Sequence, residues 1–114
     1  MDQKIKRSVA ILLAHIVKID NRDVEKQIPL FCSLMGQNFE CNQEEVAQFL
    51  RDIMLEEYDL DEHVDIIYNA LKEEDLSKMH ILEQLNHMIY SDTIAPYDYK
   101  LFEDIKKKLF PNVT

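Results

Sequence analysis

The chain has 114 residues, of which 46% are hydrophobic and 31% charged, with one glycine, three prolines and no tryptophan. This length supports one domain with one apolar core and is too short for two independently stable domains. The composition is rich in helix formers, and no stretch shows the alternation of a strand. We therefore expect an all-α fold, a compact single-domain bundle of about six or seven helices over residues 1–114.

The excess of acidic over basic residues limits the kinds of molecule that the chain can bind. Thirteen Lys and Arg stand against 22 Asp and Glu, a formal net charge of −9. Such a surface repels phosphate backbones and anionic lipid headgroups, so we expect no nucleic-acid partner. The acidity serves solubility, or it attracts cations or basic protein partners.

The apolar run Val9–Val17 follows three basic residues and superficially resembles a signal peptide. However, His15 lies within the run, Lys18 follows it directly, and no small-residue cleavage site appears. The run is also about half the roughly 20 residues that a membrane-spanning helix needs. We predict a buried core helix, no transmembrane segment and a cytoplasmic protein.

Hydrophobic spacing predicts the first two helices. The first runs from about Gln3 to Ile19 and is apolar nearly all round, which places it at the centre of the bundle. The second reaches about Gln37, but Pro29 leaves its start open. Either Asp23 caps a helix that kinks at Pro29, or regular structure begins only just before the proline.

Cap signatures predict the starts of the remaining helices. In chain order these are Asn42 with Glu45, Asp59 with Glu62, Asp75 or Ser77, and Pro96 at a first helical position. The third helix should end near Glu57 and the fifth near Ser91.

The chain repeats itself weakly. Both His15-Ile-Val-Lys-Ile-Asp20 and His87-Met-Ile-Tyr-Ser-Asp92 have a His five residues before an Asp that ends an apolar helix. We interpret this as two related helical hairpins joined by the third and fourth helices. Helical spacing alone can produce similar agreement, so chance similarity is the alternative.

Each hairpin has an acidic motif at its turn. The first motif is Ile19-Asp20-Asn21-Arg22-Asp23-Val24-Glu25. The second is Ser91-Asp92-Thr93-Ile94-Ala95-Pro96-Tyr97-Asp98. The pair resembles the tellurite-resistance TerB-like family, whose usual signature is Ala-Asp-Gly, a branched aliphatic residue and Glu. The resemblance spans nearly the whole chain. Asn21 suits the glycine position because Asn tolerates a left-handed backbone, whereas Thr93 does not, so the second turn must differ.

The resemblance implies a non-enzymatic helical domain with pseudo-two-fold symmetry, in systems that respond to chemical stress. It also implies an acidic patch that has been linked to metal-ion binding. The residues that it carries over are Asp20 and Asp92 at the motif aspartates, and Asp23 or Glu25 with Asp98 at the later acidic position.

The residues themselves suggest the same chemistry. Two loops at one end of a bundle can each donate carboxylates and main-chain carbonyls to a hard divalent cation. Asp20, Asp23, Asp92 and Asp98 are the candidate ligands, with Glu25 added by the resemblance. The alternative is that Asp23 caps a helix and the other acids are solvated loop residues.

Other chemistry has less support in the sequence. His15 and His87 can add nitrogen ligands, but each more simply lies one turn before its helix end. Cys32 and Cys41 form no CxxC and are expected to be free thiols. No nucleophile elbow, glycine-rich turn or phosphate loop occurs, so we expect no enzymatic activity.

Tyr97 and Tyr99 lie beside the acidic second loop and are the candidate partner-binding residues. Two functions follow from the sequence. The first is a TerB-like domain whose two acidic turns bind a metal ion or form a docking patch. The second is a protein-interaction module whose acids recognise a basic partner without any ion.

Overall fold

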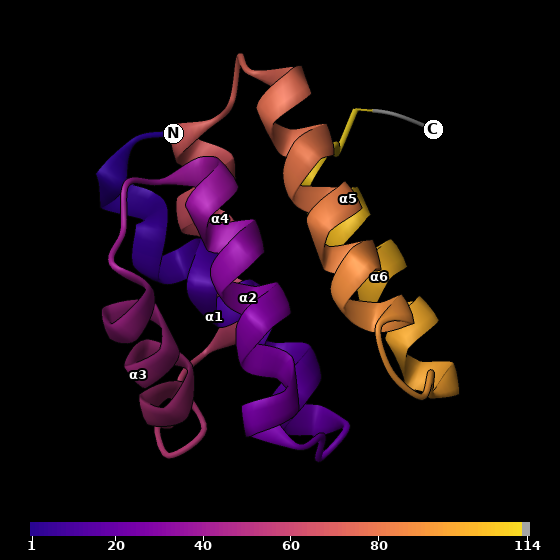
Figure 1. Ribbon diagram of the computed structural model, residues 1–114. Coiled ribbons are helices and arrows are strands. Elements are labelled where there is room, and N and C mark those ends of the chain that lie inside the picture. The colour runs from indigo at the N-terminus through magenta and orange to yellow at the C-terminus, as the bar shows by residue number, and fades with distance from the viewer. Residues whose placement is uncertain (113–114) are drawn as a thin grey trace.

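The computed structural model describes residues 1–112 and contains six α-helices, one short 3-10 helix and no strand within that range (Figure 1). In chain order these are η1 (Gln3–Ile5), α1 (Lys6–Ile19), α2 (Val24–Asn38), α3 (Gln43–Ile53), α4 (Leu60–Ala70), α5 (Asp75–Tyr90) and α6 (Pro96–Leu109). The radius of gyration, 13.2 Å, is that of a single domain packed at this length. The all-helical prediction is confirmed.

Helix α1 is the centre of the bundle, as its sequence predicts. Nine of its fourteen residues are buried, and it packs against α2, α3, α4 and α5. Apolar side chains project from all sides of α1. The neighbouring helices therefore bury them on all sides. None of the helices in residues 1–112 is long and apolar enough to cross a membrane.

The cap at Asp23, which the first of the two predicted alternatives contains, is confirmed. The Asp23 carboxylate accepts hydrogen bonds from the main-chain N–H groups of Glu25 at 3.1 Å and Lys26 at 3.4 Å. The helix then continues through Pro29 to Asn38. The cap satisfies two of the free N–H groups at the helix start, and the helix continues although Pro29 donates no main-chain hydrogen bond.

Two predicted boundaries are wrong. Helix α3 ends at Ile53, not near Glu57, and the chain turns so that the hydroxyl of Tyr58 lies 2.7 Å from Nδ1 of His15. Helix α5 starts at Asp75 without a side-chain cap, so neither Asp75 nor Ser77 has the predicted role. The Asp75 carboxylate instead pairs with the ammonium group of Lys78 at 3.2 Å.

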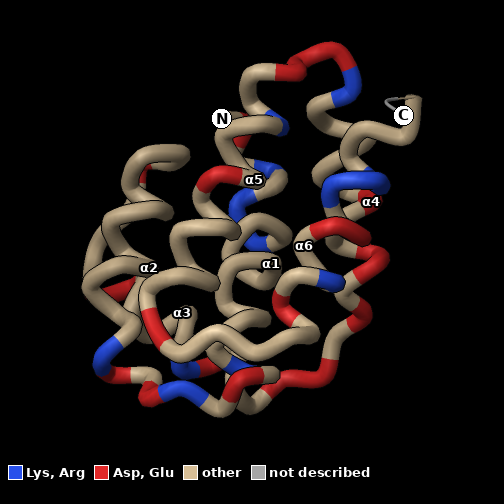
Figure 2. Tube along the Cα trace, turned by 90° about the vertical axis from the view of Figure 1, so that its right-hand side faces the viewer, with Lys and Arg blue, Asp and Glu red and all other residues tan. Residues whose placement is uncertain are grey.

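The last two helices lie side by side, and α6 also packs against α4. The turn from α1 to α2 and the turn from α5 to α6 lie at the same end of the bundle (Figure 1). Figure 2 shows Asp and Glu spread over the loops and along the helices. The fold thus brings the two acidic turns together, as the metal and docking hypotheses both require.

Candidate functional site at the junction of two loops

The first turn directs a basic side chain into the bundle. Asn21 has a φ of 51°, the left-handed conformation expected from its place in the motif. The main-chain N–H of Arg22 then donates to the carbonyl of Val17 at 3.0 Å. This tight turn leaves Arg22 only 8% exposed.

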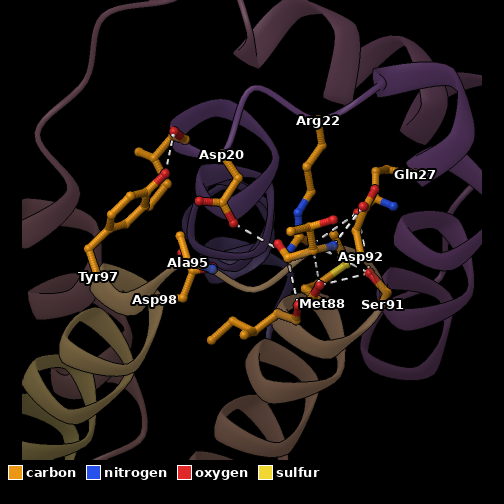
Figure 3. Close-up of polar contacts among 12 residues, drawn as sticks. Asp20, Arg22, Gln27, Met88, Ser91, Asp92, Ala95, Tyr97 and Asp98 are labelled. Atoms are coloured by element: carbon orange, nitrogen blue, oxygen red, sulfur yellow. Dashed lines mark hydrogen bonds and ion pairs between the residues drawn. The ribbon is translucent and has the colours of Figure 1, made fainter.

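Arg22 joins the two loops. Its guanidinium donates to the main-chain carbonyls of Met88, Ile89 at 2.7 Å and Thr93 at 3.3 Å, all at or just after the end of α5 (Figure 3). It also lies 3.3 Å from the carboxylate of Asp20. A cation supplied by the chain therefore occupies the carbonyl-lined space in which the sequence predicts a metal ion.

Two polar side chains extend this network. The hydroxyl of Ser91 donates to the carbonyl of Met88 at 2.7 Å and lies 3.4 Å from Oε1 of Gln27, which is buried. The same oxygen of Gln27 accepts a hydrogen bond from Arg22 at 3.4 Å. The start of α2 is thereby connected to the end of α5.

Asp98, in the first turn of α6, completes the site. We call this site the junction, and it consists of Asp20, Arg22, Gln27, Ser91 and Asp98. Asp98 is fully buried, and its Oδ2 accepts a hydrogen bond from the main-chain N–H of Ala95 at 3.0 Å. Ala95 has no side chain that can cap α6, so Asp98 instead reaches back from the first turn of the helix to the main chain of the residue before it. Burial raises the pKa of the Asp98 carboxyl, and the nearby Asp20 raises it further.

Three buried oxygens in the junction have no hydrogen bond: both carboxylate oxygens of Asp20 and Oδ1 of Asp98. Buried polar atoms are rarely left in this state. A proton on Asp98 lets that carboxyl donate to Asp20, and its raised pKa favours this arrangement. A cation between the carboxylates is the other way to satisfy the same atoms.

The remaining predicted ligands are engaged elsewhere. Asp23 caps α2, Asp92 accepts from the N–H of Thr93 at 2.7 Å, and Glu25 forms an exposed ion pair with Arg51 at 3.0 Å. Among residues 1–112 no group of three or more His, Cys, Asp or Glu side chains is arranged to hold a metal ion. Of the five predicted acids, the structure brings together Asp20 and Asp98.

The two predicted tyrosines lie on different sides of the junction. The hydroxyl of Tyr97 donates to the carbonyl of Ile19 at 3.0 Å, and the neighbouring Asp20 carboxylate raises the pKa of Tyr97. Tyr99 instead pairs edge to face with Tyr90, with 3.4 Å between the hydroxyls. Because an α-helix turns about 100° per residue, both tyrosines flank the buried Asp98, and both stay about half exposed.

Neither predicted histidine reaches the junction network. His15 contacts Tyr58, and burial together with Lys18 lowers the pKa of its imidazole. His87 lies exposed on α5. Cys32 and Cys41 are free thiols, as expected.

Arg22, Gln27 and Ser91 are the junction residues that sequence reasoning missed. The one available signal was Arg22 between Asn21 and Asp23, inside the turn motif itself. Comparison with protein-family models, curated proteins and solved structures finds no match for the chain. The TerB-like resemblance therefore rests on the two turn motifs alone.

Proposed function

We propose that this chain is a non-enzymatic, TerB-like interaction module whose two-loop surface binds a basic segment of a partner protein. The two-loop surface consists of Asp23, Asp92 and Tyr97, all exposed around the junction. The observation that carries the proposal is the position of Arg22. Its positive charge lies against Asp20 inside the junction, and the outer acids are left without a cation.

The charges support a basic partner. Inside the junction Arg22 lies 3.3 Å from the carboxylate of Asp20, and burial raises the pKa of Asp98, which favours its uncharged form. Outside it, Asp23 and Asp92 accept main-chain hydrogen bonds but form no ion pair among residues 1–112. In a chain of net charge −9, these carboxylates attract Lys and Arg, and the half-exposed ring of Tyr97 offers apolar area beside them.

The family assignment belongs to the same proposal. Helices α1 and α2 form one hairpin and α5 and α6 the other, each with an apolar helix that ends in the region of an Asp. The hydrogen bonds of Arg22 link the turn of one hairpin to that of the other. A role in the response to chemical stress, tellurite resistance included, follows from the resemblance and is proposed with it.

The test is the binding of a labelled oligolysine peptide to the purified chain. Asn caps helices as well as Asp does, so the double variant Asp23→Asn/Asp92→Asn keeps the local hydrogen bonds and removes the charges. We expect it to weaken binding several-fold, and we expect added salt to weaken binding to the wild-type chain while a chelator has no effect.

The matched control is Asp59→Asn, which neutralises an exposed helix cap at the start of α4. It should bind the peptide like the wild-type chain. Equal weakening by the control would show that only net charge matters, and loss of binding on adding chelator would show that an ion is required. Either result contradicts the proposal.

A second candidate function is cation binding between Asp20 and Asp98, favoured by their three buried oxygens without hydrogen bonds. The positive charge of Arg22 opposes it. Calorimetric titration with Ca²⁺, Mg²⁺, Mn²⁺ and Zn²⁺ tests it. Binding that both Asp20→Asn and Asp98→Asn weaken would support a metal site, and no binding at millimolar ion would remove it.

A further inference from the structure

A groove lies between the start of α1 and the outer face of α3, at the opposite end of α1 from the junction. It consists of two adjoining hollows of 380 and 300 Å³ that share Arg7, Glu45 and Phe49. The larger hollow is also lined by Gln48, Asp52 and Glu56, and the smaller by Gln3, Lys6 and Val46. We call this feature the α1–α3 groove.

The spacing of residues along α3 builds the groove. Glu45, Phe49 and Asp52 recur at intervals of four and three residues, so they form a stripe along one side of the helix. Phe49 has the helical spacing of the buried residues Val46 and Ile53, but it is only half buried and lies at this stripe. An aromatic surface thus remains open to solvent between carboxylates.

The groove already binds one guanidinium group. Arg7 lies over the ring of Phe49, with 5.8 Å from the guanidinium carbon to the ring centroid, and its Nη2 is 2.6 Å from the carboxylate of Glu56. An aromatic face and a carboxylate are the two groups that a guanidinium prefers to contact. The internal contact shows which chemistry fits this surface.

Two carboxylates of the groove remain for an incoming cation. Glu45 and Asp52 form no ion pair among residues 1–112, although Asp52 accepts a hydrogen bond from the amide of Gln48 at 2.9 Å. The larger hollow therefore has three carboxylates and a single basic side chain, that of Arg7. Its surplus negative charge complements a positive ligand.

We propose that the α1–α3 groove binds an arginine of a partner protein together with a neighbouring aliphatic side chain. The guanidinium lies against Phe49 and pairs with Glu45 and Asp52, while the aliphatic side chain enters the smaller hollow beside Val46. Arginine fits better than lysine because its planar group stacks on the ring and can donate to two carboxylates at once. This site is separate from the two-loop surface and does not depend on it.

The probe is the peptide acetyl-Gly-Arg-Ala-Leu-Gly-amide, titrated into the ¹⁵N-labelled chain and followed by NMR. We expect the amide signals of residues 45–56 to move. The citrulline counterpart keeps the shape of the arginine but has no charge, and it should bind about tenfold more weakly. The lysine counterpart should also bind more weakly than the arginine peptide.

Two conservative variants locate the site. Asp52→Asn keeps an acceptor for Gln48, and Phe49→Leu keeps apolar volume at the edge of the core, so both should remain folded, as urea unfolding will verify. Each should weaken binding of the arginine peptide several-fold, whereas Asp92→Asn in the two-loop surface should not. That control separates this inference from the proposed function, which Asp23→Asn/Asp92→Asn tests independently.

Three results would overturn the inference. The citrulline and arginine peptides bind equally, or the moving signals lie at residues 91–98, or no signal moves at millimolar peptide. In each case the α1–α3 groove has no preference for arginine.

Discussion

Three arginines pair with carboxylates, and two of them, Arg22 and Arg7, have contrasting surroundings. Arg22 lies in the junction, where its side chain and that of Asp20 are 3% and 5% exposed. Arg7 lies in the α1–α3 groove, where its side chain and that of Glu56 are 53% and 34% exposed. Arg22 also donates to three main-chain carbonyls, whereas the guanidinium of Arg7 contacts one ring and one carboxylate.

The difference separates a structural ion pair from an exchangeable one. A buried guanidinium must keep its hydrogen bonds, because removing them strands charges away from water. An exposed pair is screened by solvent and gains little, so a partner can compete with it. The junction therefore fixes the shape of the bundle end, and the groove remains available for binding.

The largest expected effect is on Arg22. Arg22→Met removes the hydrogen bonds between the loops and leaves Asp20 without its cation, which we expect to lower the free energy of unfolding by about 3–5 kcal/mol. Arg7→Met is the matched change in the groove and should cost no more than about 1 kcal/mol. Urea unfolding followed by circular dichroism measures both, and similar losses for the two variants would contradict the comparison.

The next effect is a dependence of stability on pH. Burial, followed by the nearby Asp20, raises the pKa of Asp98 in the folded chain above its ordinary value of 3.8. The stability that this residue contributes is thus fully present below its unfolded pKa and is lost as pH rises through the folded pKa. Asp98→Asn cannot ionise, so the variant should gain stability relative to the wild-type chain as pH rises.

Unfolding in urea at a series of pH values checks this dependence. The control is Asp92→Asn, which removes an exposed carboxyl from the loop before α6 and should leave the dependence of stability on pH unchanged. If the free energies of unfolding of Asp98→Asn and the wild-type chain differ by the same amount at all pH values, Asp98 does not bind a proton in this range.

A smaller effect is expected from the tyrosine hydroxyls. Tyr97→Phe removes a hydrogen bond of 3.0 Å to Ile19 that ties α6 to the end of α1. Tyr99→Phe removes only a 3.4 Å contact with Tyr90 on the surface. The thermal midpoint should fall more for Tyr97→Phe than for Tyr99→Phe, and both less than for Arg22→Met; the reverse order for the tyrosines would refute their assigned contacts.

The smallest expected effect concerns binding to the groove. Arg7→Met removes the one basic side chain that lines the larger hollow, so the arginine peptide should bind about two- to fivefold more tightly. The same NMR titration measures it. Weaker binding to this variant would show that Arg7 supports the site instead of competing for it.

The helices could be predicted because hydrophobic periodicity is a local property of the sequence. Val46, Leu50 and Ile53, for example, identify α3 without any knowledge of its neighbours. Its end could not be predicted in the same way. The chain leaves the helix after Ile53, and the contact between Tyr58 and His15 that follows joins residues 43 positions apart.

The site could be predicted only in part for a related reason. The two acidic motifs place Asp20 at the end of α1 and Asp98 in the first turn of α6, and these two residues do converge. Arg22 points inward because it donates to the carbonyls of Met88 and Ile89 in α5. These residues lie 66 and 67 residues further along the chain, so hydrophobic periodicity does not reveal the contact. Phe49 shows the same limit, since its spacing fits the core although its side chain is only half buried.

The most direct test asks whether Arg22 or a bound ion closes the junction. A cation that binds only the folded chain, at a concentration about 100 times its Kd, would raise the free energy of unfolding by about 2.7 kcal/mol. Unfolding in urea with millimolar Ca²⁺, with millimolar Mg²⁺ and with chelator measures this increase in the free energy of unfolding. We predict the same stability in all three conditions. A stabilisation by either ion that disappears in both Asp20→Asn and Asp98→Asn would contradict the account and establish a metal site.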